Sequence, residues 1–275
     1  MDSGKVKEYI KSISDLSTIP VMMGKINSIL HDSNSSSKEI CKLISHDLGL
    51  AEKVVRVANS AFFGHSGEVK DLNQAIMLLG CDRIKSIALG MSVIDMFPGN
   101  GSFNVTNLWS HGYEVALFGQ AISELICMTC PRECFLTGLL HDIGRIVFVK
   151  MDKEKFLQIR PGEDILEQER ELFGCTHAEA GAWFTAGNNM PEEIVSAIEF
   201  HHHPSKAKDY KDIVSIISLA EAISARYSRN KANDGKWIDE HDILMMEYAL
   251  TDDDILFVGE RFCAARPDLE HFFTS

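Results

Sequence analysis

Residues 135–148 read FLTGLLHDIGRIVF, and this stretch decides how the whole chain is interpreted. Its apolar residues recur at helical spacing around one ionisable pair, His141-Asp142. Gly138, His141, Asp142 and Arg145 occupy the i, i+3, i+4 and i+7 positions of one helix face. Gly138 would let another helix approach His141 closely. We therefore expect a buried helix that carries a strip of ionisable side chains.

Helices are also expected on both sides of this stretch. His111 lies on the apolar stripe of one of them, and His201 and His202 follow Ile198 on one face of another. Three inward-facing histidine positions on three helices favour a metal or anion site over separate core histidines. The predicted helices of this region cover about 105–128, 133–148, 176–186, 191–203 and 211–227.

The rest of the chain fits an all-α fold with two lobes. Residues 98–104 (PGNGSFN) form the strongest linker signal, which places the lobes at roughly 1–98 and 105–275. A helical tail is expected from about residue 237. No pair of alternating segments joined by an Asn-Gly turn suggests a β-hairpin.

The composition limits the possible functions. The chain has 275 residues, with 27 Lys and Arg against 40 Asp and Glu, and a formal charge of −13. This balance disfavours a protein that coats nucleic acid or uses a polybasic membrane anchor. The first residues (MDSGKVKEYIKSISD) lack the apolar core of a signal peptide, and no apolar run approaches the roughly 20 residues that span a bilayer. We therefore expect a cytoplasmic protein that binds neither nucleic acid nor membrane.

The cysteines have two interpretations. Cys127, Cys130 and Cys134 in CMTCPREC have a spacing that could hold zinc or an iron–sulfur cluster. No good fourth cysteine lies nearby, and Pro131 suggests that a helix begins inside the motif. We therefore favour buried structural cysteines, with all seven as free thiols.

The His-Asp pair by itself is weak evidence, because it occurs three times. The copy at 46–47 lies at a predicted helix end, and the copy at 241–242 lies in an acidic tail with no other histidine nearby in sequence. Only the copy at 141–142 sits in an apolar frame. The chemistry is therefore expected at the middle copy.

The sequence GLLHDIG (138–144) resembles the HD superfamily of metal-dependent phosphohydrolases. The wider pattern resembles its HDOD branch, the HD-related output domain of bacterial signalling, over roughly 17–228. The resemblance implies an HD-like helical bundle for the second lobe. It is carried, in order, by Ile19-Pro20, HDLGLAEKVVRVANSAFFG, AIMLLG, LWSH, HDIG, ERELFGCTHAEAGAWF and HHHP.

The resemblance also implies a set of metal ligands. His111, His141 and Asp142 match the first ligands of HD enzymes. The next ligand is expected in SLAEAISARY, where relatives tend to have Asp and this chain has Glu221, whose longer side chain leaves that ligand open. We expect one or two divalent ions per chain, with iron or manganese favoured. The positions that support a second metal in the related HD-GYP branch are matched by His177, His201 and His202.

Two departures separate the chain from HD-GYP proteins. Those proteins follow HDIG with Lys, where this chain has Arg145, and they carry a Gly-Tyr-Pro segment where this chain reads SKAKDYKD. Both disfavour cyclic-dinucleotide hydrolysis. If the site is catalytic, metal-assisted hydrolysis would use Asp142 to bridge metals and Arg145 to neutralise phosphoryl charge. Arg145 could equally be a surface or capping residue.

Two functions follow from the resemblance. The first is a signalling output module with a metal-binding HD site, whose partners are other signalling proteins or a small phosphorylated ligand. The second is a metal-dependent phosphohydrolase that acts on a phosphoester such as a nucleotide. Both share one fold, so the fold does not distinguish them. We favour the first and leave turnover and oligomeric state open.

Overall fold

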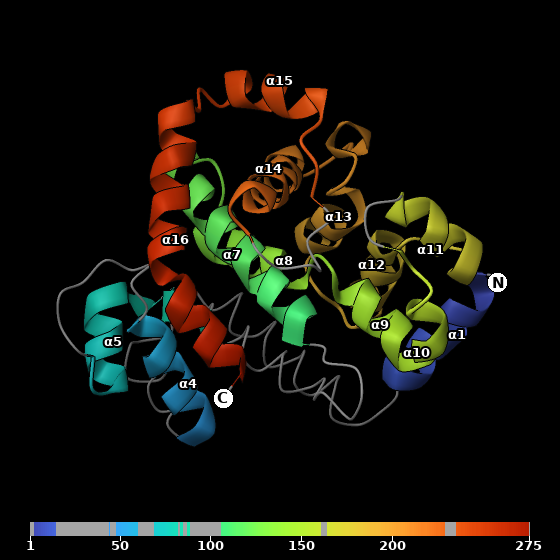
Figure 1. Ribbon diagram of the computed structural model, residues 1–275, viewed down its shortest axis with the longest axis horizontal. Coiled ribbons are helices and arrows are strands. Elements are labelled where there is room, and N and C mark those ends of the chain that lie inside the picture. The colour runs from blue at the N-terminus through green and yellow to red at the C-terminus, as the bar shows by residue number, and fades with distance from the viewer. Residues whose placement is uncertain are drawn as a thin grey trace.

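The computed structural model describes residues 3–14, 44, 48–59, 69–81, 83–84, 87–88, 106–160, 164–228 and 235–274. Every regular element in these residues is a helix, which confirms the predicted all-α fold (Figure 1). The helices are α1 (Ser3–Ser14), α4 (Leu48–Ala58), α5 (Leu72–Leu79), α7 (Thr106–Ile126), α8 (Pro131–Leu140), α9 (Ile143–Met151), α10 (Lys153–Phe156), α11 (Ile165–Phe173), α12 (His177–Gly187), α13 (Glu192–Phe200), the 3₁₀ turn η2 (Pro204–Lys206), α14 (Lys211–Tyr227), α15 (Asp239–Glu247) and α16 (Asp252–Thr274).

Helix α7 lies at the centre of the molecule and packs against α8, α14 and α16 (Figure 1). Glycines bring α7 and α8 into backbone contact. A Cβ at Gly112 would lie 2.6 Å from the carbonyl oxygen of Leu139, and a Cβ at Gly138 would lie 2.7 Å from Cα of Ala116. Both distances are shorter than a carbon atom tolerates. The close approach expected at Gly138 is therefore confirmed, and α7 is the helix that makes it.

The prediction of one continuous helix over 133–148 is wrong. Helix α8 ends at Leu140 and α9 begins at Ile143, with His141 and Asp142 in the turn between them. The break lets the two halves pack against different partners. While α8 packs on α7, α9 packs on α12, where Gly144 lies against the backbone of His177 with no room for a Cβ.

Helix α13 also ends earlier than the predicted range of 191–203. It covers Glu192–Phe200, and His201 and His202 lie in the turn that follows. The helix starts agree better with the sequence signals. Thr176 and Glu179 form the predicted capping box of α12, and α14 has the predicted bounds. His177 therefore lies at the start of α12, and His201 and His202 follow the end of α13, whereas His111 lies within α7.

The two chain ends pack on helices distant in sequence. Helix α1 packs on α9 and α12, with Lys7 Nζ 4.2 Å from the ring centroid of Trp183, and α16 packs on α4 and α7. The predicted division of the chain at 98–105 lies outside the described residues and stays a prediction. Within the described residues, no helix combines the length and apolar character needed to cross a membrane.

Candidate metal centre

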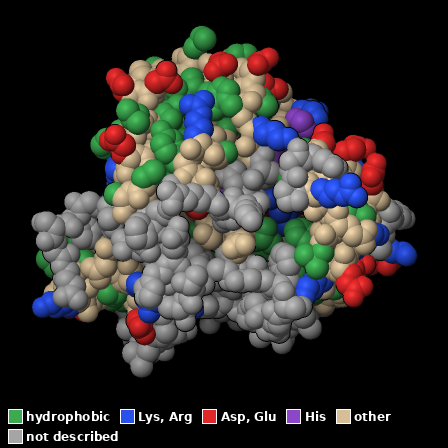
Figure 2. Space-filling view, in the orientation of Figure 1, with side chains coloured by type: hydrophobic (Ala, Val, Ile, Leu, Met, Phe, Trp, Pro, Cys, Tyr) green, Lys and Arg blue, Asp and Glu red, His purple; other side chains and the backbone are tan. Residues whose placement is uncertain are grey.

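The predicted site residues come together in one buried cluster. His111 comes from α7, His141 and Asp142 from the turn between α8 and α9, and Glu221 from α14. Their side chains are almost completely inaccessible to solvent, and His202 alone of the predicted metal ligands is partly exposed. On the face drawn in Figure 2, histidine is visible only as a small area. The other members are Arg145 near the start of α9, His177 at the start of α12, and His201 and His202 after α13.

Asp142 lies between two halves of the cluster, one that contains His111 and His141 and another that contains His177. Its Oδ2 atom is 3.8 Å from His111 Nε2 and 3.6 Å from His141 Nε2. Its Oδ1 atom is 3.1 Å from His177 Nε2 on the other side. The carboxylate thus directs one oxygen to each half, as a carboxylate that bridges two metal ions does.

Among the residues that the structure describes, three groups each have ligand atoms that lie within 4.8 Å of one another. Each group contains at least two histidines, and histidine nitrogen with carboxylate oxygen suits transition metals. Two of the groups share no residue, and the third shares one histidine with each of them, so the cluster has enough ligands for one ion or for two adjacent ions. They are His177–His201–His202, His111–His141–Glu221 and His141–Asp142–His201.

Two of the histidines are oriented by the helix that precedes them. His141 Nδ1 lies 2.7 Å from the carbonyl oxygen of Gly138, and His201 Nδ1 lies 2.6 Å from that of Ile198. Because a carbonyl oxygen only accepts, each Nδ1 carries the proton. Each neutral ring therefore presents a bare Nε2 to the cluster. This is the orientation of a histidine that binds a metal through Nε2.

Several ring nitrogens of the cluster face one another at short range. His177 Nε2 is 3.3 Å from His201 Nε2 and 3.0 Å from His202 Nε2. The His141 Nε2 atom is buried and makes no hydrogen bond within the described part of the chain. Lone pairs at such distances repel each other unless a proton or a cation lies between them. The donor set therefore fits a divalent metal ion.

The pKa values of the histidines follow from burial and from the nearby carboxylates. Burial, and then the neighbouring rings, lower the pKa of His201 well below its ordinary value. Burial also lowers the pKa of His141, against the opposing effect of Asp142. For His177 burial acts in the same direction, but the carboxylates, with Glu169 first, outweigh it and raise the pKa. His141 and His201 are thus neutral at pH 7, as metal binding requires.

Glu169 is a member of the site that was not singled out from the sequence. It is fully buried in α11 and accepts hydrogen bonds from His177 Nδ1 at 2.7 Å and from the His177 backbone N–H at 2.8 Å. A carboxylate behind a ligating imidazole fixes the ring and makes it a stronger ligand. The available signal was an acid on the buried face of α11, one turn before the core residue Phe173.

Arg145 is buried, which excludes the surface interpretation. Its Nη1 atom donates to Asp142 Oδ2 at 2.8 Å, and its Nε atom is 3.7 Å from Glu169 Oε1. The guanidinium therefore joins the two carboxylates that contact His177. It compensates negative charge within the cluster.

Glu221 reaches the cluster although it is longer than the expected Asp. Its Oε2 atom is 3.9 Å from His201 Nε2 and 3.8 Å from His202 Nδ1. His241, from the third His-Asp pair, is buried and lines a cavity together with His201 and His202. The tail copy of the pair is therefore close to other histidines in space, although not in sequence.

The cysteine motif does not form a comparable group. Within the described residues, no set of metal-ligand atoms that lie within 4.8 Å of one another includes a cysteine. Cys134 is buried, and burial raises the pKa of its thiol to about 12. Cys127 is exposed, with its Sγ atom 3.2 Å from the carbonyl oxygen of Glu124. This arrangement agrees with free thiols.

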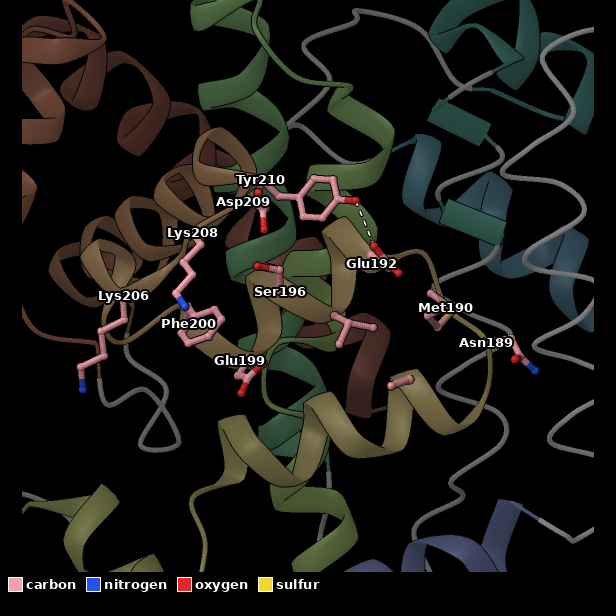
Figure 3. Close-up of a pocket in the computed structure, with 12 residues that line it drawn as sticks. Asn189, Met190, Glu192, Ser196, Glu199, Phe200, Lys206, Lys208, Asp209 and Tyr210 are labelled. Carbon is pink, nitrogen blue, oxygen red and sulfur yellow. Dashed lines mark hydrogen bonds between the residues drawn. The ribbon is translucent and has the colours of Figure 1, made fainter.

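A separate hollow of about 750 Å³ lies along the outer face of α13 (Figure 3). Phe200 and Lys208 are among its lining residues, and Tyr210 donates a hydrogen bond to Glu192 across it at 3.2 Å. None of the predicted metal ligands lines this hollow. It is called the outer groove below.

Comparison with known proteins identifies the family to which this sequence belongs. The HDOD domain family matches residues 16–204. An uncharacterized protein of Treponema pallidum (strain Nichols) is 22% identical over 219 residues, which cover 76% of this chain and 42% of that protein. This chain thus spans less than half of that relative's length.

Two solved structures share the fold. An HDOD domain protein of unknown function from Geobacter sulfurreducens has a TM-score of 0.76 and 20% identity, covering 100% of this chain and 99% of its own. A "putative phosphohydrolase" from Shewanella amazonensis SB2B has a TM-score of 0.68 and 24% identity, covering 92% of this chain and 97% of its own. These likenesses concern the fold alone. The family match covers more than half of the sequence, so the chain belongs to the HDOD domain family.

Proposed function

We propose that this chain is a signalling output module whose HD centre holds one or two divalent metal ions, with iron or manganese favoured. The observation that carries the proposal is the set of Nε2 atoms, oriented by hydrogen bonds at Nδ1, that face one another and Asp142. Its partners are other signalling proteins or a small phosphorylated ligand. Such partners would then detect whether the metal and the ligand are bound.

Within this centre each protein group has a distinct part. His111, His141, Asp142 and Glu221 would hold one ion, and the remaining histidines would hold a second ion that shares Asp142. Arg145 keeps Asp142 in place through its hydrogen bond of 2.8 Å. A bound metal ion supplies Lewis-acid polarisation of a phosphoryl oxygen and lowers the pKa of water.

The second candidate function is a metal-dependent phosphohydrolase that acts on a phosphoester such as a nucleotide. It is favoured by the cavity that reaches His201, His202 and Glu221, because a catalytic metal needs an open coordination position. In that case Asp142 would hold the ions together, and Arg145 would compensate charge on the phosphoryl group. The name of the Shewanella protein agrees with this chemistry, although it refers to that protein only.

The first test is metal content. Wild-type protein without an affinity tag, grown or reconstituted with iron or manganese, should retain one or two ions per chain by mass spectrometry. The double variant His141→Ala, Asp142→Ala should retain none. His203→Ala is the matched control, because His203 is exposed beside His202 and belongs to none of the ligand groups.

Equal metal content in the double variant and the control would overturn the proposal. If the double variant loses the metal as expected, a screen with phosphoesters decides between the two functions. Turnover by the wild-type protein that disappears in the double variant supports the phosphohydrolase. If the wild-type protein binds metal but hydrolyses no phosphoester, the signalling module is supported instead.

A further inference from the structure

Residues 235–241 lie beside the candidate metal centre and are called the C-terminal segment below. They comprise the last residues before α15 and the first residues of that helix, which packs on α14 (Figure 1). The C-terminal segment and the centre line one cavity of about 260 Å³, to which both His202 and Glu221 contribute. The segment is therefore part of the surroundings of a candidate ligand.

The C-terminal segment contacts Glu221 through Gly235. A Cβ at position 235 would lie 2.5 Å from the carbonyl oxygen of Glu221 and 3.0 Å from its Cγ atom. The backbone of the segment thus lies against both the main chain and the side chain of Glu221. Any residue with a Cβ at this position must displace the segment, the Glu221 side chain, or both.

This contact matters because Glu221 has a long side chain. Glutamate loses more rotamer freedom on ordering than most residues, so a fixed carboxylate needs support from its neighbours. The Oε2 atom of Glu221 is 3.9 Å from His201 Nε2 and 3.8 Å from His202 Nδ1. A backbone packed on Cγ limits how far the side chain can rotate away from these rings.

His241 ties the other end of the C-terminal segment to α14. Burial lowers the pKa of His241 to about 4, so the ring is neutral at pH 7. Its Nδ1 atom accepts from the Ile238 N–H at 3.1 Å, and the proton on Nε2 is then donated to Ser218 Oγ at 2.9 Å. Ser218 lies one turn before Glu221, on the same face of α14. The segment is thus held to that face at two points.

We propose that the C-terminal segment positions Glu221 as a metal ligand, with Gly235 packed on its side chain and His241 anchoring the segment at Ser218. The inference rests on the proposed metal centre and adds the residues that orient one of its ligands. Glu221 and the segment both lie beyond residues 16–204, outside the part of the chain that matches the family.

The experiment measures metal binding by the whole chain. The affinity for Mn²⁺ is determined by competition with a chelator in the wild-type protein and in Gly235→Ala. It should fall roughly 10-fold in the variant, as when a residue that orients a ligand is lost. Gly187→Ala is the matched control and should keep the wild-type affinity, because a Cβ there meets nothing within 4 Å.

The visible absorption of bound Co²⁺ separates positioning of Glu221 from support of the fold. This spectrum depends on the number and geometry of the ligands around the ion. If Gly235→Ala withdraws the Glu221 carboxylate, its spectrum should change in the direction seen in Glu221→Ala. A loss of stability alone would leave the spectrum of the folded protein unchanged.

Ser218→Ala tests the same segment without altering the contact at Gly235. It removes the acceptor of His241 Nε2, so the segment should loosen and metal affinity should fall. Ser196→Ala is the matched control, because Ser196 lies on α13 and lines the outer groove. If Gly235→Ala does not fold, Ser218→Ala decides by the same two measurements.

The outcomes separate this inference from the proposed function. Wild-type affinity in Gly235→Ala, together with weaker binding in Glu221→Ala, would overturn the inference alone. A lower affinity with an unchanged Co²⁺ spectrum would also overturn it, because the segment would then act only through the fold. Wild-type affinity in Glu221→Ala would show that there is no ligand to position. Wild-type protein that binds neither ion would overturn the proposed function and the inference with it.

Discussion

Glu169 holds His177 at both its backbone N–H and its Nδ1 atom, at 2.8 Å and 2.7 Å. Arg145 lies between Glu169 and Asp142, so the three charged groups and the imidazole form one buried network. Within it Glu169 sets the direction in which His177 Nε2 points. The ability of His177 to bind a metal should therefore depend on a residue that does not itself touch the metal.

The variant Glu169→Gln tests this dependence. It keeps the shape of the side chain but removes the charge that makes the His177 ring a stronger ligand. Metal affinity, measured by competition with a chelator, should fall roughly 10- to 100-fold. Glu167→Gln is the matched control, because Glu167 lies on the same helix and is exposed. Equal affinities in the two variants would show that Glu169 serves only the fold.

At this scale the sequence could predict which residues come together in the candidate metal centre, but not the residues that orient them. Each predicted metal ligand is present in the cluster, because the residue types and their order resemble a known pattern. The contact between Glu169 and His177 crosses the end of α11 and the start of α12. Helical periodicity places Glu169 on a buried face, but it does not show what that face touches.

At the scale of elements, the most important feature is the break between α8 and α9. Periodicity favoured one helix there, because Gly138, His141, Asp142 and Arg145 keep helical spacing across the break. The break depends on tertiary packing, since α8 must meet α7 while α9 meets α12. The local sequence carries no signal for these contacts between helices. By contrast, α12 and α13 begin where caps and Pro191 predicted, because those signals are local.

The contact between α7 and α8 makes Gly138→Ala a test of this packing. The new Cβ would lie 2.7 Å from the backbone of Ala116, so the helices must separate. We expect a loss of about 2 kcal/mol or more in the free energy of unfolding, measured with urea. Gly187→Ala, at the open end of α12, should change that free energy by no more than about 1 kcal/mol. Equal effects of the two variants would contradict the close approach.

At the scale of the whole molecule, the candidate metal centre joins helices that are far apart in sequence. Its candidate ligands come from α7, the turn between α8 and α9, α12, the turn after α13, and α14. In the unfolded chain these ligands are separated by as many as 110 positions, from His111 to Glu221. An ion that needs them together therefore binds the folded state and not the unfolded one. Metal binding and folding must then be thermodynamically linked.

This linkage predicts that a chelator lowers the melting temperature. An ion present at 100 times its dissociation constant adds about 2.7 kcal/mol to the free energy of unfolding. For a chain of 275 residues that corresponds to a rise of roughly 5–10 °C. Scanning calorimetry of protein treated with EDTA, before and after Mn²⁺ is restored, measures the difference. The variant His141→Ala, Asp142→Ala should show no such rise, because it lacks two ligands and the carboxylate between the two halves. A rise of the same size in that variant would mean that manganese stabilises the fold from some other place.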